Sequence, residues 1–573
     1  MISLLLCESF FFSCIYQPEV VQCLGIGQKT EKGMQIKIKG KVLYTYSVKR
    51  LICALCFLLF CIIDQRLKSE AGMEVFRDLT GVGMAVIIMT HYCLEDFRKW
   101  KVPYLIWTAI WVVGAPIAFF GRSDTVVLLD WLVIVLDVIL FGYILIHTFV
   151  SAVIEKKRPK LNAKVGFVWL AMMVLMIFSR SRYIWPFCYL VMFGCFYLTD
   201  YTEEEQNQLF QGMLDGIILG FFALQGFCFV FRPYDVVRYS GAFANCNMNA
   251  LFYDVVLAAV YAKIIYVTRI KSKIWVRLYY WIGAGVVISL LLLTIGRTGW
   301  ITAAVLSLLF CSLLVRQQVS KRWWKYLVTV AACVIIAFPL TFGAVRYLPP
   351  VFHHPVWFWD EWNEYRVHSW DPWDSEKYVD IDEYFDAALG RVLETIQNIM
   401  EHSPLLLKTD AAEASVVDME PILDQEQEID SLLVRGSIYK YFFQRLNMRG
   451  HPYEEQGFQL TLWYWVPHAH NIYLQYGTDF GIPVMILFTI LILGGVVLLG
   501  RRCIQRGSEV DAGCWMFLLI TAIFGLLEYS WGTGSLNIFL LFVVWKRMIC
   551  SSAKGQSCFK LFRKKDLHVP EKG

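Results

Sequence analysis

Charged residues are scarce in this sequence. Only 18% of its 573 residues are Asp, Glu, Lys or Arg, whereas 57% are hydrophobic and 16% are aromatic. This composition excludes an ordinary soluble domain and is typical of a protein that crosses the membrane several times. The lipid bilayer is therefore expected to be its main solvent.

Several motifs are also absent. The sequence contains no P-loop, no dinucleotide-binding glycine pattern, no HExxH and no internal repeat. None of the cysteines lies in the polar segment 344–467, so no disulfide framework is predicted there. Residues 1–33 lack the basic region and cleavage site of a secretory signal. Met34 is an alternative start of the chain, and residues 1–33 are interpreted as an N-terminal extension outside the fold.

What the sequence has in abundance is apolar runs long enough to cross about 30 Å of hydrocarbon. They predict an all-α polytopic membrane protein with about fourteen transmembrane helices, or twelve to fourteen when short runs are discounted. The runs are 44–64, 79–94, 103–120, 125–150, 165–179, 184–199, 210–231, 250–267, 278–295, 299–315, 326–343, 484–500, 513–528 and 535–549.

Lysine and arginine occur in nearly every second connection between these runs. The basic connections are 37–50, 97–101, 155–164, 269–277, 316–325, 501–506 and 546–565. By the positive-inside rule they are cytoplasmic, which places both termini in the cytoplasm as well. The predicted organisation is a transmembrane domain of about eleven spans at 34–343, a large extracytoplasmic loop at 344–483, C-terminal transmembrane helices at 484–549 and a basic cytoplasmic tail at 550–573.

The polar part of the loop, 344–467, is strongly acidic, with 22 Asp and Glu against 9 Lys and Arg. Because successive spans cross the membrane in alternating directions, counting them from the basic cytoplasmic connections places this segment on the extracytoplasmic side. A tryptophan-rich stretch at 357–373 is followed by expected helices near 382–402 and 428–447. We interpret this segment as a partly folded insertion.

Residues 464–483 return from this loop to the membrane and carry His468, His470 and Asn471. Imidazole titrates near neutrality and can take a proton from a hydroxyl. Asn471 is expected to cap the following turn and to fix the histidine before it. Gly477 and the Gly-Ile-Pro at 481–483 are expected to break the chain before the next apolar run. A pair of interfacial histidines at a helix start is the alternative interpretation.

Arg297 separates two apolar runs, 278–295 and 299–315, that are joined by only a few residues. A charge near hydrocarbon is costly unless it is paired or functional. Two interpretations stay open: an arginine that snorkels at a helical hairpin, or a guanidinium that binds a diphosphate bidentately.

Arg435 begins a second candidate segment. It lies near the N-terminal end of an expected helix, where a cation opposes the helix dipole. We therefore expect an anionic ligand or a carboxylate partner beside it. The apolar face of this helix is expected to consist of Ile438, Tyr439, Phe442 and Phe443.

A polar stretch before the eighth span contains Arg238, Gly241, Asn245 and Asn247. It is interpreted either as a loop that caps the span or as a site for sugar hydroxyls or phosphate. The tryptophans of 357–373 suit stacking on sugar rings. Seven of the ten histidines lie between 353 and 470, which makes a metal site an alternative, although regular ligand spacing is missing.

These stretches together resemble the O-antigen ligase and polymerase-like membrane glycosyltransferases over roughly residues 160–550. The matching pieces, in order, begin at Gly241 (G-x-F-x-N-P-N, with Cys246 in place of proline), Gly296 (S/G-R-x-G/A), Arg435 (R-x-x-I-W/Y) and His470 (H-N-x-x-L-Q, followed by two glycines). The second histidine, His468, and the long insertion depart from the family pattern.

The resemblance implies a metal-independent, inverting enzyme without cofactor at the outer face of the cytoplasmic membrane. Its donor would be a polyprenyl-diphosphate-linked glycan and its acceptor a glycan or lipid, with membrane lipids around it and no nucleic acid partner. Arg297 and Arg435 would hold the diphosphate, and His470 would act as the base. The residues expected to bind substrate are Arg238, Gly241, Asn245, Asn247, His468, Asn471 and Gln475.

Other classes of function are weighed beside this one. A transporter or flippase of lipid-linked oligosaccharide is expected to show inverted repeats and charges near mid-membrane. No repeat is visible, and most of the unusual polar residues fall outside the spans. A sensor with an outer ligand-binding loop would need a cytoplasmic output domain, for which the longest inner segment, the basic tail, is too short. Ligase and polymerase activity are both compatible with the sequence.

Overall fold

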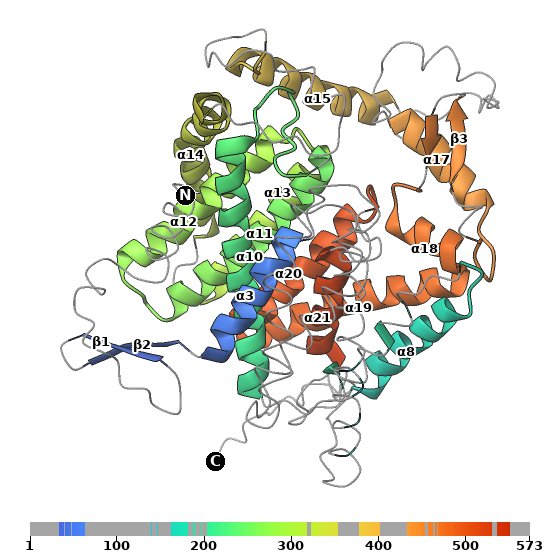
Figure 1. Cartoon of the computed structure of the whole chain (residues 1–573), viewed down its shortest axis with the longest axis horizontal. Helices are drawn as coiled ribbons and strands as arrows, with labels where there is room; N and C mark the ends of the chain where they lie inside the picture. The colour runs from blue at the N-terminus through green and yellow to red at the C-terminus, as the bar shows by residue number, and fades with distance from the viewer. Residues whose placement is uncertain are drawn as a thin grey trace, which may run out of the picture.

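A computed structural model shows a bundle of helices with two short β-hairpins (Figure 1). It describes part of the chain. The described residues are 34–38, 41–46, 48–63, 162–181, 203–243, 245–317, 322–352, 377–401, 432–452, 457–461, 464–466, 468–529 and 536–549, with a few single positions between 139 and 197.

Ten of the predicted apolar runs fall mainly on these residues, and each coincides with a helix. Those helices are α3 (Val48–Ile63), α8 (Ala163–Ile177), α10 (Glu203–Phe231), α11 (Cys246–Arg269), α12 (Ile274–Leu293), α13 (Arg297–Gln317), α14 (Trp323–Phe352), α19 (Ile482–Arg506), α20 (Glu509–Phe524) and α21 (Leu536–Ile549). Six described helices, α10 to α14 and α19, contain segments long and apolar enough to cross a membrane. The helical membrane character is therefore confirmed, while the count of fourteen stays a prediction. The runs 79–94 and 103–120, and almost all of 125–150 and 184–199, lie outside the described residues.

The remaining elements lie between or before these helices. They are the helices α15 (Ile381–Glu401), α17 (Leu432–Gln444) and α18 (Ile472–Phe480), and the antiparallel hairpins β1–β2 (Met34–Ile38, Lys41–Tyr46) and β3–β4 (Phe458–Thr461, Tyr464–Val466). The predicted helices near 382–402 and 428–447 are confirmed as α15 and α17. The predicted start of the polar loop at 344 falls inside α14, which continues to Phe352.

Close packing of the bundle depends on small residues, as is usual between helices in lipid. Gly212, Gly216 and Gly220 follow one another at every fourth position of α10 and lie against α3. A Cβ atom at Gly216 would come within 2.5 Å of the Ala54 carbonyl oxygen, so only glycine permits this approach. The backbones of α3 and α10 therefore pack directly against each other.

Helix α11 is the centre of the bundle and is buried along nearly its whole length. It packs against α10, α12, α13 and α20. In contrast, α14 exposes Ile335, Ile336 and Leu340, the apolar surface expected of a helix that faces lipid. Helix α15 runs along one end of the bundle from α14 towards α17 (Figure 1).

The two ends of the bundle differ in chemistry. Helices α11, α13, α19 and α21 carry basic residues in their last turns: Arg269, Arg316, Arg506, Lys546 and Arg547. Helix α11 has 24 residues, which at 1.5 Å per residue gives a length of about 36 Å. The basic end is thus separated from the end where α11 begins by about the thickness of a bilayer.

Candidate functional site

The candidate site lies where α11 begins and α20 ends. Its centre is the carboxylate of Glu528, just beyond α20. One oxygen, Oε1, accepts hydrogen bonds from Arg435 Nη2 at 2.8 Å and from Asn247 Nδ2 at 3.0 Å. The other, Oε2, lies 3.4 Å from His470 Nδ1. We call these four residues, Asn247, Arg435, His470 and Glu528, the Glu528 cluster.

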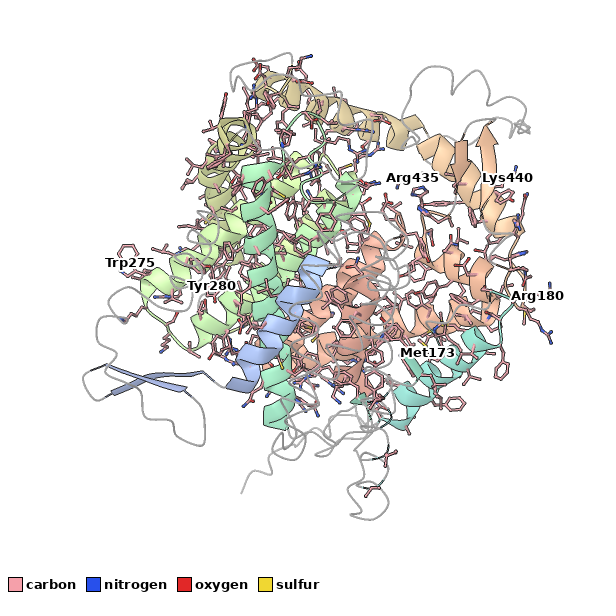
Figure 2. All side chains as sticks on the ribbon, in the orientation of Figure 1. Met173, Arg180, Trp275, Tyr280, Arg435 and Lys440 are labelled. Atoms are coloured by element: carbon pink, nitrogen blue, oxygen red, sulfur yellow. The ribbon has the colours of Figure 1, made fainter. Side chains whose placement is uncertain are left out.

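The charges of the cluster are largely withdrawn from water. The side chains of Arg435 and Glu528 are only 11% and 8% exposed. Arg435 also donates from Nη1 to the Leu527 carbonyl at 2.8 Å. The expected carboxylate partner of Arg435 is therefore Glu528, and Figure 2 shows Arg435 at the inner end of α17, with Lys440 further out on the same helix.

The two ring nitrogens of His470 have different surroundings. Its Nδ1 faces Glu528, and within the described residues its Nε2 makes no hydrogen bond. The His470 side chain is 22% exposed. In the tautomer that donates from Nδ1 to the Glu528 carboxylate, Nε2 carries the lone pair that can accept a proton.

The backbone of His470 has φ +47°, a left-handed conformation that is uncommon outside glycine. Several hydrogen bonds hold it there. The single Tyr439 hydroxyl proton is shared between the His470 carbonyl, at 3.2 Å from Oη, and the Leu526 carbonyl, at 3.1 Å. Asn471 Nδ2 donates to the same Leu526 carbonyl at 2.9 Å. The histidine loop is thereby tied to the turn that carries Glu528.

The following turn is capped as predicted. The Asn471 side chain is the N-cap of α18 and accepts hydrogen bonds from the backbone nitrogens of Tyr473 and Leu474 at 3.0 Å. Ile472 N donates to the Gly525 carbonyl at 2.8 Å. A Cβ atom at Gly525 would come within 2.6 Å of Ile472, so glycine is required for this approach.

Two details of the predicted elements were wrong. Gly477 does not break the chain but lies inside α18, packed against Leu446; the break comes at Gly481, where φ is +102°. Phe443 does not join the apolar face of α17, because it is 66% exposed while Ile438 and Phe442 are buried.

The polar stretch before α11 reaches the cluster through Asn247. Arg238 Nη2 donates to Asn247 Oδ1 at 2.7 Å, and Asn247 Nδ2 donates to Glu528. Asn245 is the N-cap of α11, which supports the interpretation of this stretch as a capping loop. Gly241 forms a turn with φ +58°, and its carbonyl accepts from Arg232 Nε at 2.7 Å. In the described part of the chain, Asn247 links this stretch to Glu528 directly, and Arg238 is linked to Glu528 through Asn247.

His468 and Gln475 lie behind the histidine loop. The ring of His468 packs edge-on against that of His470, with centroids 4.4 Å apart. Burial, helped by the neighbouring His470, lowers the pKa of His468 to about 3. Gln475 is buried, accepts from Ala469 N at 2.6 Å and donates to Asp479 Oδ1 at 2.8 Å. Both residues therefore support the loop from inside.

Arg297 begins α13 and makes contacts to α15. Its Nη1 lies 3.5 Å from Glu394 Oε1 and 3.5 Å from Thr395 Oγ1. A Cβ atom added at the preceding residue, Gly296, would lie 3.7 Å from Asn247 Oδ1. The N-terminus of α13 thus borders the Glu528 cluster, while the Arg297 side chain pairs with a half-exposed carboxylate of the loop.

Glu528 and Tyr439 are the two members of the site that the sequence prediction missed. Glu528 is a lone acidic residue at the end of the predicted apolar run 513–528, on the side that parity assigns to the histidines. That combination is a usable signal, because an isolated charge at a span end requires a partner. Tyr439 was assigned only to the apolar face of its helix. Burial raises the pKa of its hydroxyl to about 12, so it acts as a neutral donor.

The arrangement combines two arginines, one carboxylate and one imidazole at a helix N-terminus. Arg238 and Arg435 contribute guanidinium groups, and the start of α13 adds the positive end of a helix dipole. Such groups suit an anion beside a proton acceptor. Among the described residues, no group of three His, Cys, Asp or Glu is placed to hold a metal ion.

Comparison of the chain with protein-family models, with curated proteins and with solved structures finds no match.

Proposed function

We propose that this protein is an O-antigen ligase-like membrane glycosyltransferase. It transfers or polymerises a polyprenyl-diphosphate-linked glycan at the outer face of the cytoplasmic membrane. The observation that carries the proposal is the Glu528 cluster, in which Glu528 joins His470 to Arg435 and Asn247. Three motifs that carry the family resemblance, at 241–247, 435 and 470, contribute to or border this cluster.

The chemistry of glycosyl transfer needs two kinds of group. Cleavage of a glycosyl–phosphate bond places negative charge on the departing diphosphate, and the acceptor hydroxyl must lose a proton as it attacks. Guanidinium groups serve the first need and an imidazole serves the second. Attack opposite the leaving group would invert the anomeric carbon.

In this proposal His470 Nε2 takes the proton of the acceptor hydroxyl. Glu528 orients the ring through Nδ1 and stabilises the imidazolium that forms. Arg435 contacts the diphosphate, with Arg297 at the adjoining start of α13, and Arg238 and Asn247 bind the glycan or phosphate oxygens. Arg297 would then exchange its long contacts to α15 for the ligand.

The outer location is supported by the two ends of the bundle. The cluster lies at the end where α11 starts, and the basic last turns of α11, α13, α19 and α21 lie at the other. Because basic residues favour the cytoplasmic side, the cluster faces outward.

The direct test is release of polyprenyl diphosphate from a lipid-linked glycan by the purified full-length protein. We expect Arg435→Ala to abolish release. Lys440→Ala is the matched control, because Lys440 lies on the same helix but is exposed and outside the cluster. Release by neither the parent protein nor the control, in the presence of a suitable acceptor, would overturn the proposal.

A flippase of lipid-linked oligosaccharide is the second candidate, and one observation favours it. Asp254, in the middle of α11, is fully buried, and within the described residues neither carboxylate oxygen has a hydrogen-bond partner. Ionisable residues inside a membrane often mark transport pathways. Liposomes with a fluorescent lipid-linked glycan distinguish the two functions: a flippase moves the intact lipid between leaflets without releasing diphosphate, and Asp254→Asn should stop that movement.

A further inference from the structure

Helix α15 presents large apolar side chains on one exposed side. Successive residues of a helix are about 100° apart, and these side chains fall within an arc of about 120°, so they form one continuous face. Asp382 borders this face in the first turn, where the helix dipole stabilises a carboxylate. We call the face the α15 stripe. Its members, each 38–57% exposed, are Ile381, Phe385, Leu389, Val392, Leu393 and Ile396.

The other two sides of α15 have a different chemistry. One side packs on the bundle: Tyr384 is buried there, and Glu394 Oε1 lies 3.5 Å from Arg297 Nη1 at the start of α13. Another side is polar and exposed, with the acidic residues Glu383 and Asp386. A helix with a protein-facing side, an acidic side and an exposed apolar side is suited to the boundary between protein, water and lipid.

The first turn of α15 lies beside the outer part of α14. The Tyr384 ring has its centroid 5.5 Å from that of Phe338 and 6.2 Å from that of Phe342. The Phe385 ring, in the stripe, lies 6.1 Å from Phe338. Both α14 residues belong to the last two turns of the predicted apolar run 326–343. The stripe therefore begins where the hydrocarbon is expected to end, and it continues the apolar surface that α14 exposes to lipid.

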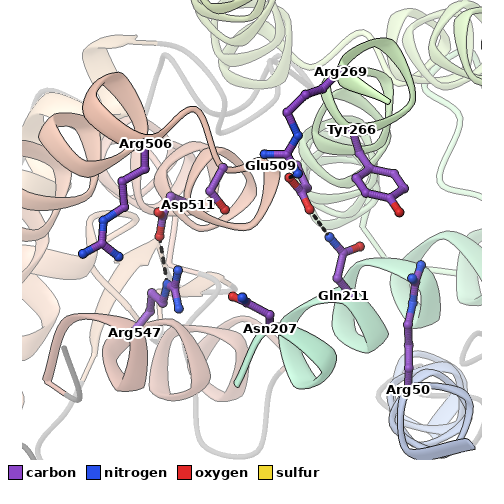
Figure 3. A pocket seen from close by; sticks show the side chains of 10 residues that line it. Arg50, Asn207, Gln211, Tyr266, Arg269, Arg506, Glu509, Asp511 and Arg547 are labelled. Atoms are coloured by element: carbon purple, nitrogen blue, oxygen red, sulfur yellow. Dashed lines mark hydrogen bonds and ion pairs between the residues drawn. The ribbon is translucent and has the colours of Figure 1, made fainter. Parts of the chain in front are cut away.

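The chemistry of the two bundle ends indicates which leaflet the stripe meets. At the basic end, Arg269, Arg506 and Arg547 lie around a polar cavity, where Arg547 Nε donates to Asp511 Oδ1 at 2.8 Å (Figure 3). Helix α14 starts next to the basic connection 316–325 of that end, whereas α15 crosses the opposite end of the bundle (Figure 1). Because basic residues favour the cytoplasmic side, the stripe is on the outer side.

We propose that α15 is an interfacial helix whose apolar stripe lies in the outer leaflet of the membrane. A helix in this position buries its apolar face about 5–10 Å into the boundary between headgroups and acyl chains. Its acidic side gives no attraction to anionic headgroups, so the contact depends on apolar burial. Because Glu394 lies on the side away from the stripe, this position holds Glu394 against Arg297. The contact with lipid does not depend on whether the protein is a transferase or a flippase.

The test uses full-length, cysteine-reduced protein in phosphatidylcholine vesicles, labelled with nitrobenzoxadiazole at a single cysteine. Leu389→Cys places the label in the stripe. Gly390→Cys is the matched control, because this position is exposed outside the stripe and an added Cβ meets no atom within 4 Å. Nitroxide lipids with shallow and deep quenchers measure the depth of the label, and iodide measures its access to water. Leu393→Cys, one turn further along, gives a second position in the stripe.

We expect the labels at 389 and 393 to lie about 5–10 Å below the headgroups and to resist iodide, whereas iodide quenches the label at 390. Added phosphatidylglycerol should leave these depths unchanged. Iodide quenching at 389 and 393 equal to that at 390 would place the stripe in water and overturn the proposal. Protection from both quenchers would also overturn it: loss of this protection on dilution of the protein in lipid indicates a second copy, and its persistence indicates another part of the chain.

Discussion

Replacement of Glu528 by glutamine gives the sharpest test of the candidate site. The change keeps the shape of the side chain and removes its charge. Glutamine still offers one oxygen, which can accept from Arg435 or Asn247. Its NH2 group would then face His470 Nδ1, where Glu528 now accepts. The imidazole would have to switch tautomer, so that Nε2 carries the proton and cannot act as a base.

The two consequences differ in size. Loss of a hydrogen bond to a charged group costs about 1.5–3 kcal/mol of folding free energy. Loss of the carboxylate that orients a catalytic histidine lowers the rate about 10⁴-fold in the serine protease example. We therefore expect the rate of Glu528→Gln to fall roughly 100- to 10 000-fold, or about 3–5 kcal/mol in the barrier, with a smaller loss of stability.

The assay is single-turnover release of polyprenyl diphosphate at saturating lipid-linked glycan, with folding checked by tryptophan fluorescence in denaturant. Arg435→Gln should destabilise the fold by about 3–5 kcal/mol, because it leaves Glu528 buried without its main partner. The double variant Arg435→Gln/Glu528→Gln should recover part of that loss. Folded Glu528→Gln protein that keeps a third or more of the parent's rate would refute the orienting role of Glu528.

Four further outcomes follow from the same geometry. His470→Ala should abolish transfer while His468→Ala retains part of it, and added chelator should change neither; equal, mild losses would instead indicate an interfacial or metal-binding pair. Arg297→Lys should lose about 30- to 1000-fold in rate, nearly as much as Arg297→Ala, because lysine cannot bind a diphosphate bidentately; activity within about threefold of the parent would leave this arginine a structural role only. His468 binds its proton less readily in the folded than in the unfolded protein, so it should favour unfolding progressively as pH falls from about 6.5 towards 3; at pH 5.5 the effect is about 1.4 kcal/mol, and thermal unfolding of His468→Gln should show a shallower pH dependence if this is correct. In intact cells a cysteine-reduced variant should react with an impermeant thiol reagent at a cysteine placed at Ser375 but not at Ser508, and the reverse pattern would invert the topology.

Most of the bundle could be predicted from the sequence because one physical signal determines it. In lipid a chain must satisfy its own backbone hydrogen bonds, so each apolar run of sufficient length becomes a helix. Local backbone geometry indicated where α18 and α19 begin, because Asn471 caps the turn that follows it and Gly481 with Pro483 interrupts the chain. The prediction that Gly477 breaks the chain was wrong, because a glycine inside a helix can serve close packing as well as a turn.

The site was predictable only in part. His470 and Arg435 stood out because each is a polar group in an unusual place, but their shared partner Glu528 is distant in sequence from both. Sequence parity placed these residues on one side of the membrane without placing them in contact. The pairing of Arg297 with Glu394 was likewise hidden, because the acidic loop offers many equivalent carboxylates. Such pairings depend on tertiary packing, on which local patterns carry no information.

The left-handed backbone of His470 lowers the stability of the fold, while the proposed chemistry requires a histidine side chain at this position. A side chain with a Cβ atom pays about 1 kcal/mol or more in this conformation, whereas glycine adopts it freely. A library of variants selected only for thermal resistance should therefore enrich glycine or asparagine at position 470. The proteins recovered by such a selection would be more robust and, if His470 is the base, inert.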